Sequence, residues 1–162
     1  MAYKVLSDDI TFANMNSDNP KVCFLHGWGM SGKDFNKIET SFDFITIDIP
    51  GFGKSVPFTT SFSPKKYAEY LDNLIPESVE IIVGHSFGGR IAVHLSQLRD
   101  FKKLVLIASP LIKKKNQKNQ FSFYKLYKAL NKINLISDDL LDQMKDKYGS
   151  KDYRNANKIL KD

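Results

Sequence analysis

The sequence predicts an α/β fold in which a mostly parallel sheet is flanked by helices. Short apolar runs that are typical of strands alternate with helix-like stretches over residues 1–110. The later strand-like runs are continuously apolar, as expected of parallel strands that are covered on both faces. A Gly-x-Ser-x-Gly segment at 84–88 joins one of these runs directly to a helix-like stretch.

Six strands and three helices are expected in this part of the chain. We expect strands at residues 3–6, 10–14, 21–26, 43–49, 79–84 and 102–108, and helices at 32–39, 64–74 and 87–98. Ser63 and Pro64 support the second helix, because serine is a common N-cap and proline fits the first helical turn. From Phe121 onward the apolar spacing becomes helical, which predicts helices in the C-terminal part.

Residues 84–88 read Gly-His-Ser-Phe-Gly and have the pattern of a nucleophile elbow. A strand that turns at once into a helix places the middle residue, Ser86, on a strained and exposed corner. Gly84 and Gly88 fit such a corner because the backbones crowd there. The Ser86 hydroxyl would then lie over the positive end of the following helix. An ordinary Gly/Ser turn has the same pattern, so the pentapeptide alone leaves both interpretations open.

Two further motifs follow strand-like runs. The first is His26-Gly27-Trp28-Gly29, and the second is Asp-x-Pro-Gly-x-Gly-x-Ser at 48–55. With these three motifs in this order, the chain resembles the α/β-hydrolase superfamily. Within it, the chain is most similar to small carboxylesterases of the pimeloyl-ACP methyl ester esterase type. The resemblance covers about residues 3–110 and implies an α/β-hydrolase fold.

The resemblance also implies roles for individual residues. Ser86 would be the catalytic nucleophile of a serine esterase and would form an acyl-enzyme with an ester or thioester. The backbone N–H groups of Trp28 and Phe87 would form the oxyanion hole, and the Trp28 side chain would line the acyl pocket. The structural residues of the motifs would be His26, Gly27, Gly29, Gly84 and Gly88. The resemblance implies neither a cofactor nor a metal.

The general base of such an enzyme is not evident in the sequence. A serine nucleophile needs a base and an orienting acid, which follow it along the chain in this superfamily. The three histidines are His26, His85 and His94, and we expect a structural role for each. After the sixth strand, where some family members carry the acid, the sequence reads Ala-Ser-Pro at 108–110. We therefore expect a C-terminally truncated hydrolase whose last strands are missing and whose activity is weak or absent.

Charge divides the chain into two parts. Residues 1–110 carry 11 Lys/Arg and 12 Asp/Glu, whereas residues 111–162 carry 13 and 6. We expect the first part to be the hydrolase core and the second to be a basic linker with a partial helical cap. The lysine-rich region at 113–118 fits either an acidic acyl carrier protein or a solvated linker. The 21 lysines and 3 arginines argue against nucleic-acid binding, because phosphate and base readers favour arginine.

Other features bear on the compartment and on alternative functions. No apolar stretch reaches the length of a membrane span, and the single cysteine, Cys23, favours a cytoplasmic protein. Residues 27–34 match Gly-x-x-x-x-Gly-Lys, the start of a nucleotide-binding P-loop, but Asp34 stands where a hydroxyl must bind Mg²⁺. Nucleotide binding is therefore the weaker alternative. A non-catalytic acyl- or ester-binding remnant and half of a split enzyme stay open.

Overall fold

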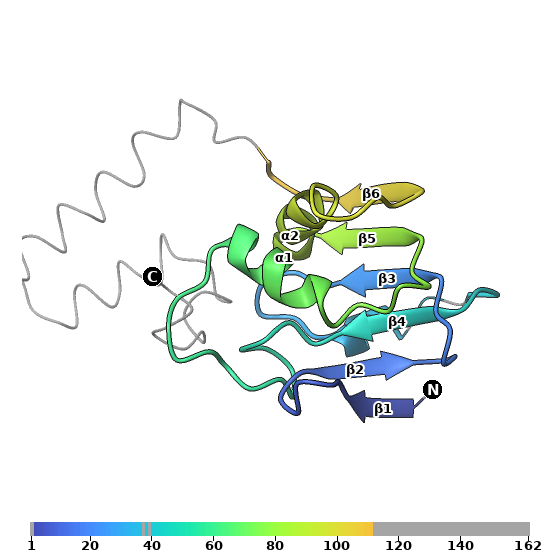
Figure 1. Cartoon of the computed structure of the whole chain (residues 1–162), viewed down its shortest axis with the longest axis horizontal. Coiled ribbons are helices and arrows are strands. Elements are labelled where there is room, and N and C mark those ends of the chain that lie inside the picture. The colour runs from blue at the N-terminus through green and yellow to red at the C-terminus, as the bar shows by residue number, and fades with distance from the viewer. Residues whose placement is uncertain (1, 37, 39, 112–162) are drawn as a thin grey trace, which may run out of the picture. The chain divides into compact units, whose positions relative to one another are not determined.

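The computed structural model describes residues 2–36, 38 and 40–111, which include one six-stranded sheet in the order β1-β2-β4-β3-β5-β6 (Figure 1). The strands are β1 (Ala2–Val5), β2 (Phe12–Met15), β3 (Val22–Leu25), β4 (Phe44–Ile47), β5 (Ile81–His85) and β6 (Lys103–Ile107). β2 pairs antiparallel with β1 and β4, whereas the β3–β4, β3–β5 and β5–β6 pairs are parallel. The six predicted strands and the mostly parallel sheet are confirmed.

Two of the three predicted helices form as expected. They are α1 (Pro64–Asp72) and α2 (Phe87–Leu95). Pro64 opens α1, and the Ser63 side chain caps it by accepting a hydrogen bond from the Lys66 N–H at 3.3 Å. The helix expected over 32–39 is wrong in type and length, because the structure has a 3₁₀ helix, η1 (Gly32–Phe35). Glycine, aspartate and asparagine are weak helix formers, so the turn that begins at Ser31 does not extend into an α-helix.

The sheet has an apolar cluster on each face, as the strand alternation requires. One cluster joins residues of β3, β4 and β5 to the inner faces of α1 and α2; it includes Leu25, Ile45, Ile47, Leu71, Ile82, Ile91 and Leu95. The other joins Val22, Phe24, Phe44 and Val83 to Phe35 of η1. Burying each of these large side chains stabilises the fold by about 1.5–3 kcal/mol. Of the two helices, α2 packs directly on β3, β5 and β6, and α1 packs on α2.

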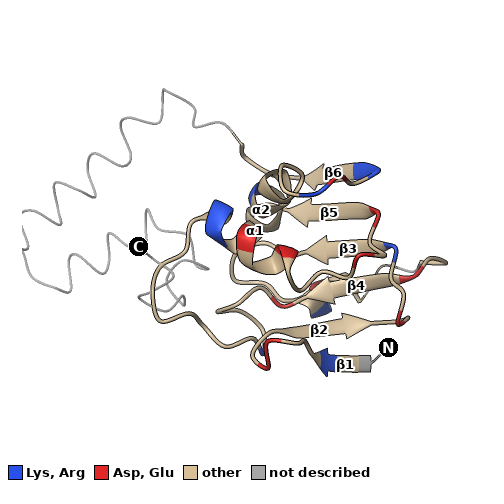
Figure 2. Cartoon of the chain, in the orientation of Figure 1, with Lys and Arg blue, Asp and Glu red and all other residues tan. Residues whose placement is uncertain are grey.

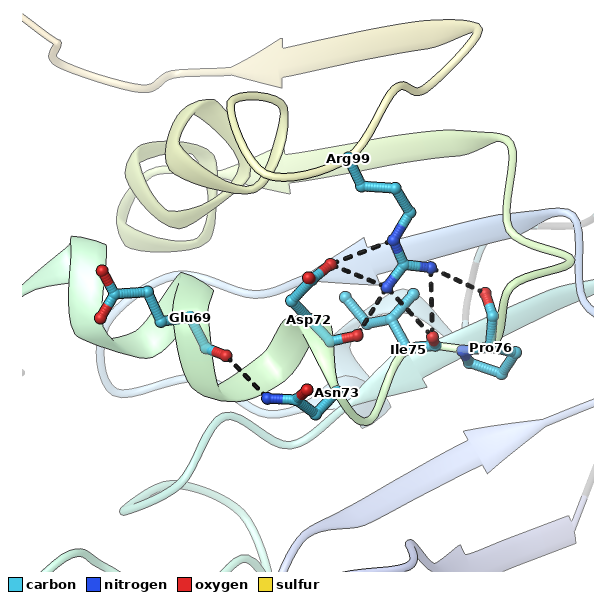
Figure 3. Close-up of polar contacts among 6 residues, drawn as sticks. All are labelled: Glu69, Asp72, Asn73, Ile75, Pro76 and Arg99. Carbon is cyan, nitrogen blue, oxygen red and sulfur yellow. Dashed lines mark hydrogen bonds and ion pairs between the residues drawn. The ribbon is translucent and has the colours of Figure 1, made fainter.

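Arg99 fastens the segment after α2 to the end of α1 (Figure 3). Its Nε and Nη2 donate to one carboxylate oxygen of Asp72 at 3.0 and 2.9 Å. Its Nη2 also donates to the Asp72 carbonyl at 2.6 Å, and Nη1 donates to the carbonyls of Ile75 and Pro76 at 3.2 and 3.3 Å. The last carbonyls of a helix lack intrahelical donors, and Arg99 supplies one to the Asp72 carbonyl as well as to two carbonyls in the segment that follows α1.

β6 lies at one end of the sheet and, among the described strands, pairs only with β5. Its residues are exposed on both faces, and the exposed fraction ranges from 37% at Leu104 to 44% at Ile107. An apolar strand with a free edge is a site for pairing with other strands. The predicted linker and helical cap fall on residues 112–162, outside the described part of the chain.

Charged side chains of both signs surround the end of the sheet where β3, β5 and β6 begin (Figure 2). Lys21 and Lys102 pair with the two carboxylate oxygens of Glu80 at 3.4 and 2.6 Å. All three side chains are substantially exposed, so these pairs contribute little to stability. Within residues 2–36, 38 and 40–111, no helix is long and apolar enough to cross a membrane.

Candidate active site

Ser86 stands on the corner between β5 and α2. Its backbone has φ 49° and ψ −106°, a conformation that residues other than glycine rarely adopt. The Ser86 N–H donates to the Ile107 carbonyl of β6 at 2.9 Å, so the neighbouring strand holds the corner in place. Ser86 occupies the N-cap position of α2, but its side chain makes no capping hydrogen bond. The hydroxyl is therefore not engaged with the first turn of the helix.

Close backbone contacts surround this corner. A Cβ atom at Gly84 would lie 2.5 Å from the Cα atom of Gly89, and one at Gly88 would lie 2.6 Å from the carbonyl oxygen of His26. The Gly88 N–H also donates to the His26 carbonyl at 3.0 Å. The start of α2 thus lies in close contact with the end of β3. Only glycine fits at positions 84 and 88.

The His26-Gly27-Trp28-Gly29 segment follows β3 and lies beside the corner. It forms a turn in which the Met30 N–H donates to the Gly27 carbonyl at 3.2 Å and Gly29 has φ 72°. The Trp28 and Phe87 rings meet edge to face with centroids 5.3 Å apart. The structure therefore brings together, next to Ser86, the two residues that were predicted to provide the oxyanion hole.

An aromatic wall continues from these two rings. Phe52 lies 5.0 Å from Trp28 and 6.3 Å from Phe87 between ring centroids, and Tyr67 of α1 lies 5.5 Å from Phe87. The Tyr67 hydroxyl donates to the Pro50 carbonyl at 3.1 Å, and burial raises the pKa of Tyr67 to about 12. These rings come from two loops and from the helices α1 and α2, and they form one side of the candidate site.

Asp48 organises the loop that carries Phe52. Its carboxylate is buried and accepts hydrogen bonds from the Gly32 N–H at 2.7 Å, the Lys54 N–H at 2.9 Å and the Tyr3 hydroxyl. Burial and the Asp48 carboxylate raise the pKa of Tyr3. Asp48 thus connects the backbone of the segment after β3 to that of the loop after β4.

The same contacts bear on nucleotide binding. In a P-loop, backbone N–H groups surround the phosphates. Here the Ser31 N–H donates to the Asp34 carboxylate at 2.7 Å, and the Gly32 N–H donates to Asp48. The carboxylates of Asp34 and Asp48 thus accept hydrogen bonds from N–H groups that would have to bind a phosphate. The segment therefore lacks the geometry of a P-loop.

His26 cannot act as a base in this arrangement. Its Nδ1 lies 2.7 Å from the Gly27 carbonyl, and its Nε2 accepts a hydrogen bond from the Ile49 N–H at 2.9 Å. Both ring nitrogens are therefore engaged by the backbone, with the proton on Nδ1. Burial lowers the pKa of His26, which further favours the neutral ring. His26 connects the ends of β3 and β4.

His85 is also directed away from the corner, and His94 lies about two helical turns after Ser86 on α2. The His85 Nδ1 would lie 2.7 Å from a Cβ atom at Gly27, so its ring lies against the turn after β3. By strand alternation, His85 shares the face of Val83, opposite to α2. The Nδ1 atoms of His85 and His94 are buried without hydrogen-bond partners among the described residues. No hydrogen bond joins a histidine to the Ser86 hydroxyl in this part of the chain.

One contact at this corner was not anticipated. Ser109 follows β6, is half-buried and donates a hydrogen bond back to the Gly84 carbonyl, just before the Ser86 corner, at 3.3 Å. The sequence shows only that the segment at 108–110 contains no acid. The contact depends on the register between β5 and β6, for which the sequence has no signal.

Comparisons with known proteins agree with this arrangement. The sequence pattern of the alpha/beta hydrolase family matches residues 24–151. The pimeloyl-[acyl-carrier protein] methyl ester esterase of Pseudoalteromonas atlantica is 35% identical over 109 residues, which cover 60% of this chain and 40% of the relative. The enzyme of the same name from Chromobacterium violaceum is 33% identical over 104 residues, with the same coverage.

Solved structures share the fold. An esterase from Mycobacterium tuberculosis has a TM-score of 0.59 and 25% identity, over 65% of this chain and 41% of that one. MenH from S. aureus has a TM-score of 0.55 and 23% identity, over 76% of this chain and 51% of that one. The chain spans about 40% of the length of the curated relatives it matches.

Proposed function

Because this chain belongs to the alpha/beta hydrolase family, we propose that it carries the nucleophile of a serine esterase, with Ser86 attacking a carboxylic ester or thioester. The observation that carries the proposal is the strained backbone of Ser86 between the end of β5 and the N-terminus of α2. An outlying conformation held by tight packing is common at catalytic residues. In this conformation the Ser86 hydroxyl would lie at the carboxyl end of β5, beside the turn that carries Trp28.

The chemistry follows the general scheme of a serine hydrolase. The Ser86 oxygen attacks the carbonyl carbon, and the carbonyl oxygen becomes an oxyanion. The backbone N–H groups of Trp28 and Phe87 stabilise this oxyanion, and losing one such donor typically lowers the rate by about 10²–10³-fold. A base takes the Ser86 proton and returns it to the departing alcohol or thiol, and water then releases the acid from the acyl-enzyme.

The relatives support a narrower substrate class. They are named for a methyl ester that is attached to an acyl carrier protein. We propose that the substrate of this chain is also an ester, with an apolar acyl part. The aromatic wall of Trp28, Phe52 and Phe87 would contact this acyl part. An acidic carrier protein would be expected to contact the lysine-rich region at 113–118, which lies outside the described residues.

Hydrolysis of a short p-nitrophenyl ester tests the role of Ser86. We expect Ser86→Ala to abolish the protein-dependent turnover. The matched control is Ser96→Ala, because Ser96 ends the same helix and donates a hydrogen bond to the Val93 carbonyl at 2.9 Å. Ser96→Ala and His94→Ala should retain turnover. Turnover that survives Ser86→Ala would rule out Ser86 as the nucleophile.

The histidine geometry favours one second candidate, an ester-binding protein without turnover. His26 is held by the backbone on both ring nitrogens, and His85 lies against Gly27 on the face opposite to α2. Trp28 is the single tryptophan of the chain, so its fluorescence reports on the candidate site directly. Saturable fluorescence change with a non-hydrolysable ester analogue, together with no Ser86-dependent turnover, would favour binding alone.

A further inference from the structure

The ends of β5 and β6 share an unusual backbone feature. Ser86 follows β5 with φ 49°, and Ala108 follows β6 with φ 47°. Neither residue is a glycine, and an alanine lacks the polar side chain that helps asparagine or aspartate adopt such a φ. The strain at Ala108 therefore has to be offset by stabilising contacts that the turn makes possible.

The turn at Ala108 directs Ser109 back onto the nucleophile corner. The Ser109 hydroxyl lies 3.3 Å from the Gly84 carbonyl oxygen and 3.1 Å from that of Ile107, so one proton is shared between two acceptors. Ser109 is half-buried, whereas Ala108 and Pro110 on either side are exposed.

Ser109 also fills space that α2 leaves empty. A Cβ atom at Gly89 would overlap the Ser109 hydroxyl and lie 2.6 Å from the Ser109 Cβ. Gly89 belongs to the first turn of α2, directly after the corner. The serine side chain therefore contacts the helix at the place where the missing side chain of Gly89 allows the closest approach.

Two of these contacts converge on the nucleophile. The Ile107 carbonyl that accepts from Ser109 also accepts the Ser86 N–H at 2.9 Å. The Gly84 carbonyl, the other acceptor, opens the Gly-x-Ser-x-Gly segment. Ser109 thus bonds to the backbone just before the corner and to the β6 carbonyl that holds the Ser86 N–H. It has no hydrogen bond to the Ser86 side chain among the described residues.

We propose that Ser109 is a positioning residue for the Ser86 nucleophile, which it holds through the Gly84 and Ile107 carbonyls. The inference rests on the proposed role of Ser86 and deepens it. The Ser109 hydroxyl stabilises the strained backbone of the corner through these two carbonyls. Without it, the loop after β6 separates from α2 and Ser86 relaxes toward an ordinary φ.

Amide hydrogen exchange by NMR on the 162-residue chain tests this placement without any need for catalysis. In Ser109→Ala we expect the Ser86 N–H to exchange roughly five- to tenfold faster, since the hydrogen bonds lost are worth about 1 kcal/mol. The Leu25 and Ile47 amides, in central strands, serve as the reference and should keep their rates. The matched control, Ser96→Ala, loses a comparable serine-to-carbonyl hydrogen bond and should leave the Ser86 rate unchanged.

The conservative variant separates positioning from general stability. Ser109→Thr keeps the hydroxyl and should restore the slow exchange of Ser86. An unchanged Ser86 rate in Ser109→Ala, or an increase shared equally by the reference amides, would overturn the proposal. Ester turnover measured on the same samples distinguishes the two claims: faster exchange without turnover in any variant would support the placement and argue against the proposed function.

Discussion

Replacing Ser86 by glycine should leave the protein more stable than replacing it by alanine, the reverse of the usual order. Both substitutions remove the hydroxyl, so they differ only in the backbone freedom of residue 86. With φ 49° and ψ −106°, an alanine keeps the strain of the native serine, whereas a glycine relieves it. The comparison therefore measures the strain at the corner itself.

The expected magnitude follows from two opposing terms. A residue in such a sparsely populated region costs about 1–3 kcal/mol. The glycine variant loses about 0.4–1 kcal/mol of folding stability, because glycine loses more conformational freedom on folding than alanine does. The free energy of unfolding should thus be higher for Ser86→Gly by roughly 1 kcal/mol, which shifts the melting temperature of a chain of this size by about 2–4 °C.

The assay is urea unfolding followed by circular dichroism, with Ser96 as the matched position. Ser96 has φ −67° and ψ −8°, an ordinary helical backbone. There, Ser96→Gly should be less stable than Ser96→Ala by about 0.5–1 kcal/mol. The same order and size of difference at Ser86 as at Ser96 would refute the claim that the corner is strained.

Three further changes have defined outcomes. Arg99→Ala should lower the free energy of unfolding by about 1–3 kcal/mol, because it removes the guanidinium donor from four acceptors at and just after the end of α1. Arg99→Lys should lower it by about half as much. The pKa of His26 lies below its ordinary value of 6.5, so as the pH falls the unfolded chain binds the proton before the folded protein does. The free energy of unfolding should therefore decrease as the pH drops below 6.5, and His26→Gln should make this decrease smaller in unfolding curves. Val105→Lys should reduce the light scattering of concentrated protein, because it adds a charge to the exposed β6.

Each of these expectations has a contrary result. An Arg99→Ala protein within about 0.5 kcal/mol of the parent would show that the bonds to Asp72 are replaced by water without loss. An unchanged pH slope in His26→Gln would assign the acid sensitivity to other groups. Equal scattering of the parent and Val105→Lys would show that the edge of β6 does not associate.

The strands were predictable because burial on both faces leaves a continuous apolar run in the sequence. β3 and β4 are buried at every position, and each was expected to within two residues at either end. The helix expected at 32–39 is wrong because the apolar spacing of Phe35 and Ile38 resembles that of a helix, whereas the segment also contains a glycine, an aspartate and an asparagine, which have low helix propensity. Local pattern therefore located the element but not its type.

At the candidate site, the sequence indicated the residues that local motifs carry. Ser86, Trp28 and Phe87 lie close together because the parallel neighbours β3 and β5 end on the same side of the sheet. The contacts of Ser109 and Arg99 could not be predicted in this way. Ser109 reaches Gly84 across 25 residues, and Arg99 reaches Asp72 across 27, so both depend on packing that no local pattern encodes.

A base added in solution tests whether Ser86 lacks one of its own. The sequence has three histidines, and none is hydrogen-bonded to Ser86 among the described residues, so the serine would react slowly with an ester. Free imidazole should then accelerate the acylation of Ser86 by p-nitrophenyl acetate, measured as the acetylated fraction by mass spectrometry, with Ser86→Ala as the control for other sites. Acylation that is fast without imidazole, unaffected by it and lost in either His85→Ala or His94→Ala would identify that histidine as a base within this chain and contradict the expectation.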